Sequence, residues 1–179
     1  DAYQAVEDAG ILSVCAAGNF SKDIDVDPFQ PAGLGNRGIL TVLASDSLNK
    51  LASFSNYGFV STDVSAPGVN VLSTVPTNSS YQISDTSGYK VLSGTSMSTP
   101  HVSGLAALVL SLNENQTVYE LKNTLLNHDS TDEMTEMGLL SSTGAKVNAQ
   151  KTLNNPLVVN PKTNAPPKIL NVLHYDVIA

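Results

Sequence analysis

The hydrophobic residues of the chain fall into short continuous runs separated by polar turns. Residues 11–17 and 39–44 are apolar without alternation, a pattern typical of strands that are buried on both faces. A helix is predicted over residues 2–9, with Gly10 as its C-terminal stop. Its apolar face consists of Ala2, Ala5, Val6 and Ala9. A helix followed by two such strands predicts an α/β fold, with a parallel sheet and helices on its faces.

The middle of the chain has a different pattern, in which Ser, Asn, Gly and Pro separate short apolar runs. Residues 64–68 are expected to form a loop, followed by a strand over 69–75. The polar residues 78–90 predict an exposed loop or hairpin. Residues 105–112 are almost entirely apolar, which predicts a buried helix.

Two further helices are expected towards the C-terminus. An amphipathic helix is predicted over 117–127, where Thr117 and Glu120 have the spacing of a capping box. Its inner side would consist of Val118, Leu121, Leu125 and Leu126. One more short helix is expected within residues 144–153.

The last segment is rich in proline and asparagine. Asn-Pro pairs at 155–156 and 160–161, and Pro-Pro at 166–167, are spaced as in an extended linker. Residues 169–179 then become apolar again. We therefore predict one folded unit over residues 1–153 and an extension or linker over residues 154–179.

Composition limits the classes of protein to consider. A chain of 179 residues with 41% hydrophobic and 14% charged residues can bury a real core. A net charge of −7 argues against nucleic acid as a partner, and no apolar run approaches the ~20 residues of a membrane span. The single cysteine, Cys15, excludes an internal disulfide and is interpreted as a small buried hydrophobe, not as a catalytic thiol.

One serine stands where a helix is about to begin. Residues 94–104 read Gly-Thr-Ser-Met-Ser-Thr-Pro-His-Val-Ser-Gly, which places Ser96 just before the apolar helix. Free backbone N–H groups and the helix dipole favour negative charge at such a position. This setting suits a nucleophile whose attack generates an oxyanion.

A second polar feature follows the first buried strand. Asn19 comes at its carboxyl end, after Ala16, Ala17 and Gly18, and functional sites collect at the carboxyl ends of strands in open α/β sheets. The side-chain amide of Asn19 could donate a hydrogen bond there, and Gly18 leaves room for a substrate backbone. An ordinary turn residue is the alternative interpretation of Asn19.

These segments together resemble the subtilisin-like serine proteases, the subtilases. Residues 94–104 are similar to the serine motif of that family, and Ala-Ala-Gly-Asn at 16–19 to its asparagine segment. Residues 52–58 and 63–68 resemble intervening stretches in the correct order. The resemblance runs from residue 1 to about 153. It implies a three-layer subtilisin-like fold, with a mostly parallel sheet flanked by helices, of which this chain would be the C-terminal part.

The resemblance also implies roles for individual residues. Ser96 would be the nucleophile of a serine endopeptidase that forms an acyl-enzyme. Asn19 would stabilise the oxyanion through its side-chain amide, with the backbone N–H of Ser96 as second donor. The backbone around Ala16, Ala17 and Gly18 would form one wall of the primary specificity pocket, and Phe29 and Gln30 are candidates for its floor.

The sequence departs from the family in one respect. Subtilase triads run Asp, His, Ser along the chain, and neither the Asp motif nor the His motif of the family occurs here. We expect the N-terminal part of the catalytic domain, on the same precursor or a separate chain, to supply both residues. This chain alone is then expected to be incomplete and inactive. The alternative is a non-catalytic subtilase-like subunit, structural or peptide-binding.

None of the histidines is a convincing replacement for the missing base. His101 lies five positions after Ser96, about 140° round the helix, and we expect a packed or hydrogen-bonded core residue. His128 is interpreted as a favourable cation at a helix C-terminus. His174 matches no family motif, so a permuted triad is disfavoured.

Metal binding and localisation have weaker signals. Asp23, Asp25 and Asp27 alternate and could suit calcium as a structural ion, although a solvated acidic loop is the favoured interpretation and no cofactor is expected to be required. Asn78 and Asn115 open glycosylation sequons. Together with the usual secretion of subtilases, these sequons favour a secreted or secretory-pathway protein.

Overall fold

The computed structural model describes residues 2–78, 80 and 82–155. Its main feature is a five-stranded sheet in the order β1-β2-β3-β7-β6. The strands are β1 (Ser13–Ala16), β2 (Ile39–Ser45), β3 (Val64–Pro67), β7 (Ala145–Val147) and β6 (Thr131–Glu133). All pairs are parallel except β6 with β7. The expected α/β fold with a mostly parallel sheet is confirmed.

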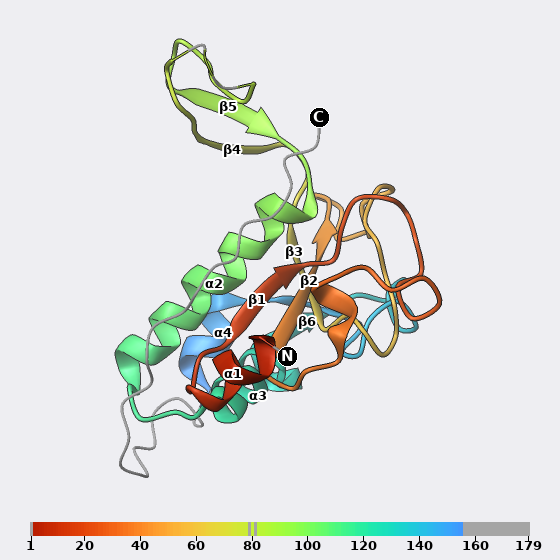
Figure 1. The fold of residues 1–179 in the computed structure, drawn as a ribbon, viewed down its shortest axis with the longest axis vertical. Coiled ribbons are helices and arrows are strands. Elements are labelled where there is room, and N and C mark those ends of the chain that lie inside the picture. The colour runs from red at the N-terminus through yellow and green to blue at the C-terminus, as the bar shows by residue number, and fades with distance from the viewer. Residues whose placement is uncertain (1, 79, 81, 156–179) are drawn as a thin grey trace.

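The sheet is buried on both faces, as the unbroken apolar runs predicted. Every residue of β2 is buried. Leu40 and Val42 belong to a cluster on one face that includes Val102 and Leu105 of helix α2 (Thr95–Leu112), whereas Leu43 packs on the other face with a second, smaller cluster. Figure 1 shows α2 running along the sheet.

The prediction of a loop at residues 64–68 is wrong for its first four residues. They form β3, in which Val64, Ser65 and Ala66 are buried and pair with β2. Serine and proline in so short a segment looked like turn residues. Pro67, however, stands at the end of the strand, where a missing N–H costs little.

The helix near the N-terminus, α1 (Ala2–Asp8), forms as predicted but does not bury the expected face. Its alanines are exposed, and its buried residue is Glu7. Glu7 Oε2 accepts a hydrogen bond from Gly38 N at 2.8 Å, and Oε1 accepts one from the hydroxyl of Tyr119. A long-range polar contact thus determines which side of α1 faces the protein.

Helix α2 is buried only on its sheet-facing side, so the prediction of a buried helix is half right. Val102, Leu105, Ala106 and Val109 are buried. Leu108 and Leu112 on the other side are 51% and 59% exposed. No helix among the described residues is long and apolar enough to cross a membrane.

The amphipathic helix α3 (Val118–Leu126) confirms its predicted cap. Thr117 Oγ1 accepts from Glu120 N, while Glu120 Oε2 accepts from Thr117 N at 2.8 Å. The predicted inner residues are buried, apart from Leu126, which is half-buried. A partly buried ion pair, Lys122 Nζ to Asp63 Oδ1 at 3.1 Å, ties α3 to the sheet.

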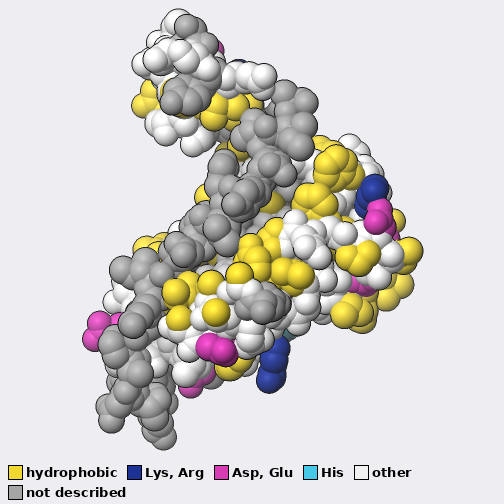
Figure 2. Space-filling view, viewed as in Figure 1, with side chains coloured by type: hydrophobic (Ala, Val, Ile, Leu, Met, Phe, Trp, Pro, Cys, Tyr) yellow, Lys and Arg dark blue, Asp and Glu magenta, His cyan; other side chains and the backbone are white. Residues whose placement is uncertain are grey.

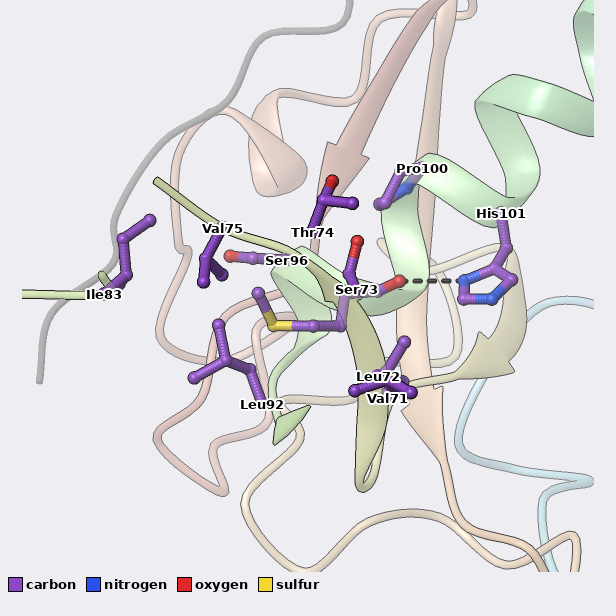
Figure 3. Close-up of a pocket in the computed structure, with 11 residues that line it drawn as sticks. Val71, Leu72, Ser73, Thr74, Val75, Ile83, Leu92, Ser96, Pro100 and His101 are labelled. Carbon is purple, nitrogen blue, oxygen red and sulfur yellow. Dashed lines mark hydrogen bonds between the residues drawn. The ribbon is translucent and has the colours of Figure 1, made fainter. Parts of the chain in front are cut away.

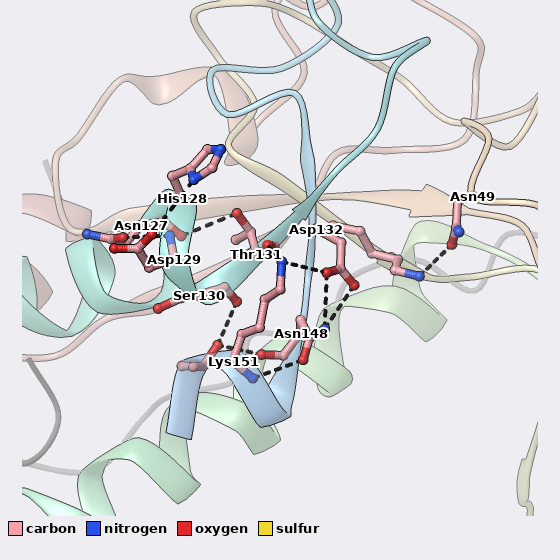
Figure 4. Close-up of polar contacts among 11 residues, drawn as sticks. Asn49, Asn127, His128, Asp129, Ser130, Thr131, Asp132, Asn148 and Lys151 are labelled. Carbon is pink, nitrogen blue, oxygen red and sulfur yellow. Dashed lines mark hydrogen bonds and ion pairs between the residues drawn. The ribbon is translucent and has the colours of Figure 1, made fainter. Parts of the chain in front are cut away.

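The short helix predicted within 144–153 forms as α4 (Ala149–Asn154), which ends one residue later, and β7 precedes it in the same segment. Asn148 and Lys151 both contact Asp132, and these contacts join β6, β7 and α4 (Figure 4). The linker and extension predicted over 154–179 lie, after residue 155, outside the described residues.

The strand and hairpin predicted over 69–90 form the β4–β5 hairpin, which consists of β4 (Val71–Thr74), β5 (Tyr89–Leu92) and their connection. It projects from the body just before α2 begins (Figure 1). Leu72, Tyr89 and Val91 are exposed on it. Figure 2 shows hydrophobic side chains on the side of the projecting hairpin that faces the body.

Candidate active site

The carboxyl end of β1 and the N-terminus of α2 meet at a small set of hydrogen bonds. Thr95, the first residue of α2, donates from its backbone N to Asn19 Oδ1 at 2.9 Å and from Oγ1 to the same oxygen at 3.0 Å. Gly18 N donates to Thr95 Oγ1 at 3.2 Å. Asn19 and the residue before Ser96, 76 positions apart in sequence, are therefore in direct contact.

These contacts determine the orientation of the Asn19 amide. A backbone N–H can only donate, so the atom of Asn19 that faces Thr95 N must be the oxygen. The nitrogen, Nδ2, then lies on the other side, 3.5 Å from the position that a Cβ on Gly94 would occupy. It has no hydrogen-bond partner within the described part of the chain. Asn19 thus presents a free donor above the start of α2.

Ser96 is the second residue of α2 and is half-buried. Its backbone N–H belongs to the first helical turn, where no intrahelical acceptor exists. Its side chain lines a cavity of about 480 Å³ between α2 and the β4–β5 hairpin, together with Val75 and Leu92 (Figure 3). Across the described residues, no hydrogen bond to the Ser96 hydroxyl is found.

The predicted pocket wall lies directly before Asn19. Ala16 ends β1 and is half-buried, whereas Ala17 is fully buried against Leu43 and Met137. Gly18 has φ +100°, and the Phe29 ring lies only 2.9 Å from the position of a Cβ there. The structure thus places Phe29, a candidate for the pocket floor, beside this wall.

Two residues that contact the site were assigned no role from the sequence. Thr95 holds the Asn19 side chain, and the buried Asn56 contacts the backbone on both sides of Asn19. Only weak sequence signals pointed to these two residues: Thr95 is adjacent to Ser96, and Asn56 lies in one of the intervening stretches that resemble the family.

No described histidine is hydrogen-bonded to Ser96, although His101 lines the same cavity (Figure 3). His101 is exposed, and its Nδ1 lies 2.8 Å from the backbone oxygen of Met97 (Figure 3). The expected hydrogen bond is present, but the expected burial is wrong. His128 lies at the protein surface, its Nδ1 3.8 Å from Asp129 (Figure 4). His174 lies outside the described residues.

Cys15 is confirmed as a buried residue. It is 1% exposed, and burial raises the pKa of its thiol to about 12. It therefore carries a proton at neutral pH and does not act as a thiolate.

The three alternating aspartates are engaged separately. Asp25 accepts hydrogen bonds from the backbone of Val60 and Ser61 at 2.9 and 2.8 Å. Burial opposes ionisation of Asp25, but these amides hold the pKa of its carboxyl below the usual value. Asp27 pairs with Lys22 at 2.6 Å. No group of three or more potential metal ligands occurs among the residues that the structure describes.

Comparison with known proteins gives consistent matches. The model of the Subtilase family matches residues 1–160. Alkaline protease 1 of Emericella nidulans is 47% identical over 112 residues, which cover 61% of this chain and 25% of that protein. The cuticle-degrading serine protease of Arthrobotrys oligospora is 48% identical over 113 residues, covering 63% of this chain and 25% of the relative.

Two further matches extend the comparison. Alkaline elastase YaB of a Bacillus species is 40% identical over 134 residues, or 69% of this chain and 30% of that protein. A solved protease structure from Pseudoalteromonas arctica superposes with a TM-score of 0.70 at 29% identity, covering 85% of this chain and 44% of that one. The chain thus spans about a quarter to a third of the length of these curated relatives.

Proposed function

This chain belongs to the subtilase family, and on that premise we propose that it carries the nucleophile and oxyanion-binding half of a serine endopeptidase active site. The observation that carries the proposal is the pair of hydrogen bonds from Thr95 to Asn19 Oδ1. They leave Asn19 Nδ2 free beside the start of α2, where Ser96 stands.

The chemistry follows from these positions. Ser96 Oγ attacks the carbonyl carbon of the scissile peptide bond while a histidine base takes the hydroxyl proton. The carbonyl oxygen becomes an oxyanion, which accepts hydrogen bonds from Asn19 Nδ2 and the Ser96 backbone N–H. Collapse of this intermediate breaks the C–N bond, and the proton passes from histidine to the leaving amine. Water then hydrolyses the acyl-enzyme by the same steps.

We propose that the histidine and its aspartate belong to a further segment, the N-terminal part of the catalytic domain. Three observations support this. No described histidine is hydrogen-bonded to Ser96, the relatives are three to four times as long as the region matched, and several surfaces are left uncovered. β1 is the outer strand of the described sheet, and Leu108 and Leu112 of α2 are exposed.

The substrate in this proposal is a polypeptide that lies against the backbone around Ala16, Ala17 and Gly18. Secretion is proposed from the sequons at Asn78 and Asn115 together with the usual location of subtilases. Calcium as a structural ion stays a prediction. Asp23 accepts from the amide of Asp25 and Asp27 pairs with Lys22, both within the loop, whereas Asp25 accepts from the amide of Val60 outside it.

A fluorophosphonate probe, which modifies activated serines, tests the proposed function directly. We expect the complete protein, with its triad segment, to be labelled and the Ser96→Ala variant to remain unlabelled. Ser111→Ala is the matched control, because Ser111 lies on the same helix with its hydroxyl bonded to Leu108 O. Absence of Ser96-dependent labelling in folded protein would support the non-catalytic subunit instead.

A further inference from the structure

Asn56 is a fully buried polar residue near the site, with 0% exposure. Its Nδ2 donates to Ala17 O at 2.8 Å. Its Oδ1 accepts from Phe20 N at 2.9 Å and from Lys22 N at 3.1 Å. One side chain thus binds the backbone immediately before and immediately after Gly18 and Asn19.

The backbone of Asn56 adds a further contact, since its N–H donates to Gly18 O at 2.9 Å. The approach is so close that a Cβ on Gly18 would lie 2.4 Å from Asn56 Nδ2. Asn56 is itself anchored to the sheet through Ser55, whose Oγ donates to Asn56 O and accepts from Ala44 N of β2. Through Asn56 and Ser55, the 17–22 segment is therefore anchored to the C-terminal end of the buried strand β2.

We propose that Asn56 is a positioning residue for the oxyanion donor. Asn56 fixes the backbone of the segment that carries Asn19, while Thr95 fixes the rotation of its amide. Together they determine where Asn19 Nδ2 points. The inference rests on the proposed function, because it assigns Asn56 an effect on catalysis that passes entirely through Asn19.

The kinetic consequence is specific. An oxyanion forms only during reaction, so displacement of its donor lowers kcat and leaves KM nearly unchanged. Asn56→Asp keeps the two acceptor contacts to Phe20 and Lys22 but loses the donor to Ala17 O. A displacement near 1 Å lowers the rate by up to roughly 100-fold. We therefore expect a loss in kcat of about 10- to 100-fold.

A double-mutant cycle with Asn19→Ala on the complete protein tests the mechanism. Asn19→Ala is expected to lower kcat by ~10²–10³-fold, the order established for such a donor in subtilisin. Once Asn19 is removed, Asn56→Asp should lower kcat by less than about 3-fold more. If the two losses multiply instead, Asn56 acts independently of Asn19 and the inference is overturned.

The control is a second buried asparagine remote from the site. Asn155 is buried and its Nδ2 donates to Ser130 Oγ at 2.8 Å. We expect Asn155→Ala to change kcat by less than about 3-fold even though a buried hydrogen bond is lost. A kcat loss as large as that of Asn56→Asp would show a general effect of instability and would overturn the inference.

Amide hydrogen exchange gives a readout that is independent of activity. In Asn56→Asp and in the smaller Asn56→Ser, the amides of residues 17–22 should exchange faster than in the parent, while those of β2 stay protected. Failure of both variants to fold, or unchanged exchange at 17–22, contradicts the positioning role. If the parent protein shows no Ser96-dependent labelling, the proposed function fails, and the exchange data still decide whether Asn56 holds the segment.

Discussion

At the scale of single residues, the site depends on contacts between positions far apart in the sequence. Ser96 and Asn19 were selected from motifs, but the groups that orient Asn19 were not. Thr95 lies 76 positions from Asn19, and Asn56 lies 36 positions from Phe20, whose amide it binds. Sequence patterns identify residues that carry chemistry, whereas their supporting partners become visible only when the fold brings them together.

Thr95→Val tests the orientation of the Asn19 amide. The substitution removes the Thr95 hydroxyl but keeps the backbone N–H that donates to Asn19 Oδ1. Gly18 N also loses its acceptor, so we expect a stability loss of about 1–3 kcal/mol. With one hydrogen bond left to orient the amide, kcat should fall about 5- to 10-fold. Thermal unfolding and steady-state kinetics on the complete protein measure both effects.

Thr124→Val is the matched control for that substitution. Thr124 is also buried, and its hydroxyl donates to Glu120 O within α3, far from Ser96 in the chain. We expect a comparable or smaller loss of stability and no change in kcat. Equal kcat values for Thr95→Val and the parent protein would contradict the orienting role of the hydroxyl.

Glu7 is a residue whose burial could not be predicted, because its contacts to Tyr119 and Gly38 are long-range. The Tyr119 hydroxyl, and next the Gly38 amide, hold the pKa of Glu7 below its usual value of 4.5. A depressed pKa means that ionised Glu7 stabilises the folded state above pH 4.5, and that this stabilisation is lost as the pH falls through the folded-state pKa.

We therefore expect the free energy of unfolding to decline below about pH 4.5 in part because of Glu7. Urea unfolding of the complete protein and of its Glu7→Gln variant, between about pH 3 and pH 6, measures that part. The variant should show a shallower decline over this interval. Glu114→Gln, at an exposed position between α2 and α3, is the control and should follow the parent curve. Parallel curves for Glu7→Gln and the parent would refute the assignment.

At the scale of helices and strands, prediction succeeded where local pattern and burial agree. The unbroken apolar runs gave β1 and β2, and Thr117 with Glu120 gave the start of α3. Prediction failed for β3, because Ser65 and Pro67 resemble turn residues in so short a segment and its burial is determined by pairing with β2. It was incomplete for α2, whose outer side is apolar yet uncovered by any described residue.

Thr117→Ala tests the contribution of the capping box to α3. The substitution removes the hydroxyl that accepts from Glu120 N, and loss of such a cap costs about 1 kcal/mol. Denaturant unfolding of the complete protein should show a lower midpoint with an unchanged slope. Thr117→Ser keeps the acceptor and should recover most of the stability. An alanine variant as stable as the parent would show that α3 is held by packing alone.

At the scale of the whole molecule, the described residues form a sheet and helices that leave apolar side chains exposed. Within the described part of the chain, β1 has a partner strand on one side only, and Leu72, Leu108 and Leu112 are exposed on the hairpin and on α2. Such exposed apolar side chains are expected if a further part of the fold covers them. The Asp and His motifs that the sequence lacks and the exposed apolar residues of the structure both support the proposal of such a part.

Residues 1–179 expressed alone are therefore expected to show no peptidase activity and no cooperative unfolding. The catalytic base is absent from the described surroundings of Ser96, and the uncovered leucines favour association over a compact state. Calorimetry and a peptidase assay, run beside the complete protein, measure both properties. Cooperative unfolding together with hydrolysis by the 179 residues would contradict the proposal that a second segment completes the domain.

A substitution of Leu108 in the complete protein tests whether a second segment covers the outer side of α2. Leu108 is 51% exposed here, but if another segment covers α2, Leu108→Ala creates a cavity and costs about 2–5 kcal/mol, as buried leucines do. Leu139 is 81% exposed on the loop after β6, and Leu139→Ala should change stability by less than about 0.5 kcal/mol. Small and equal effects of the two substitutions would mean that the outer side of α2 stays in water. The base for Ser96 would then have to reach the site without packing on that helix.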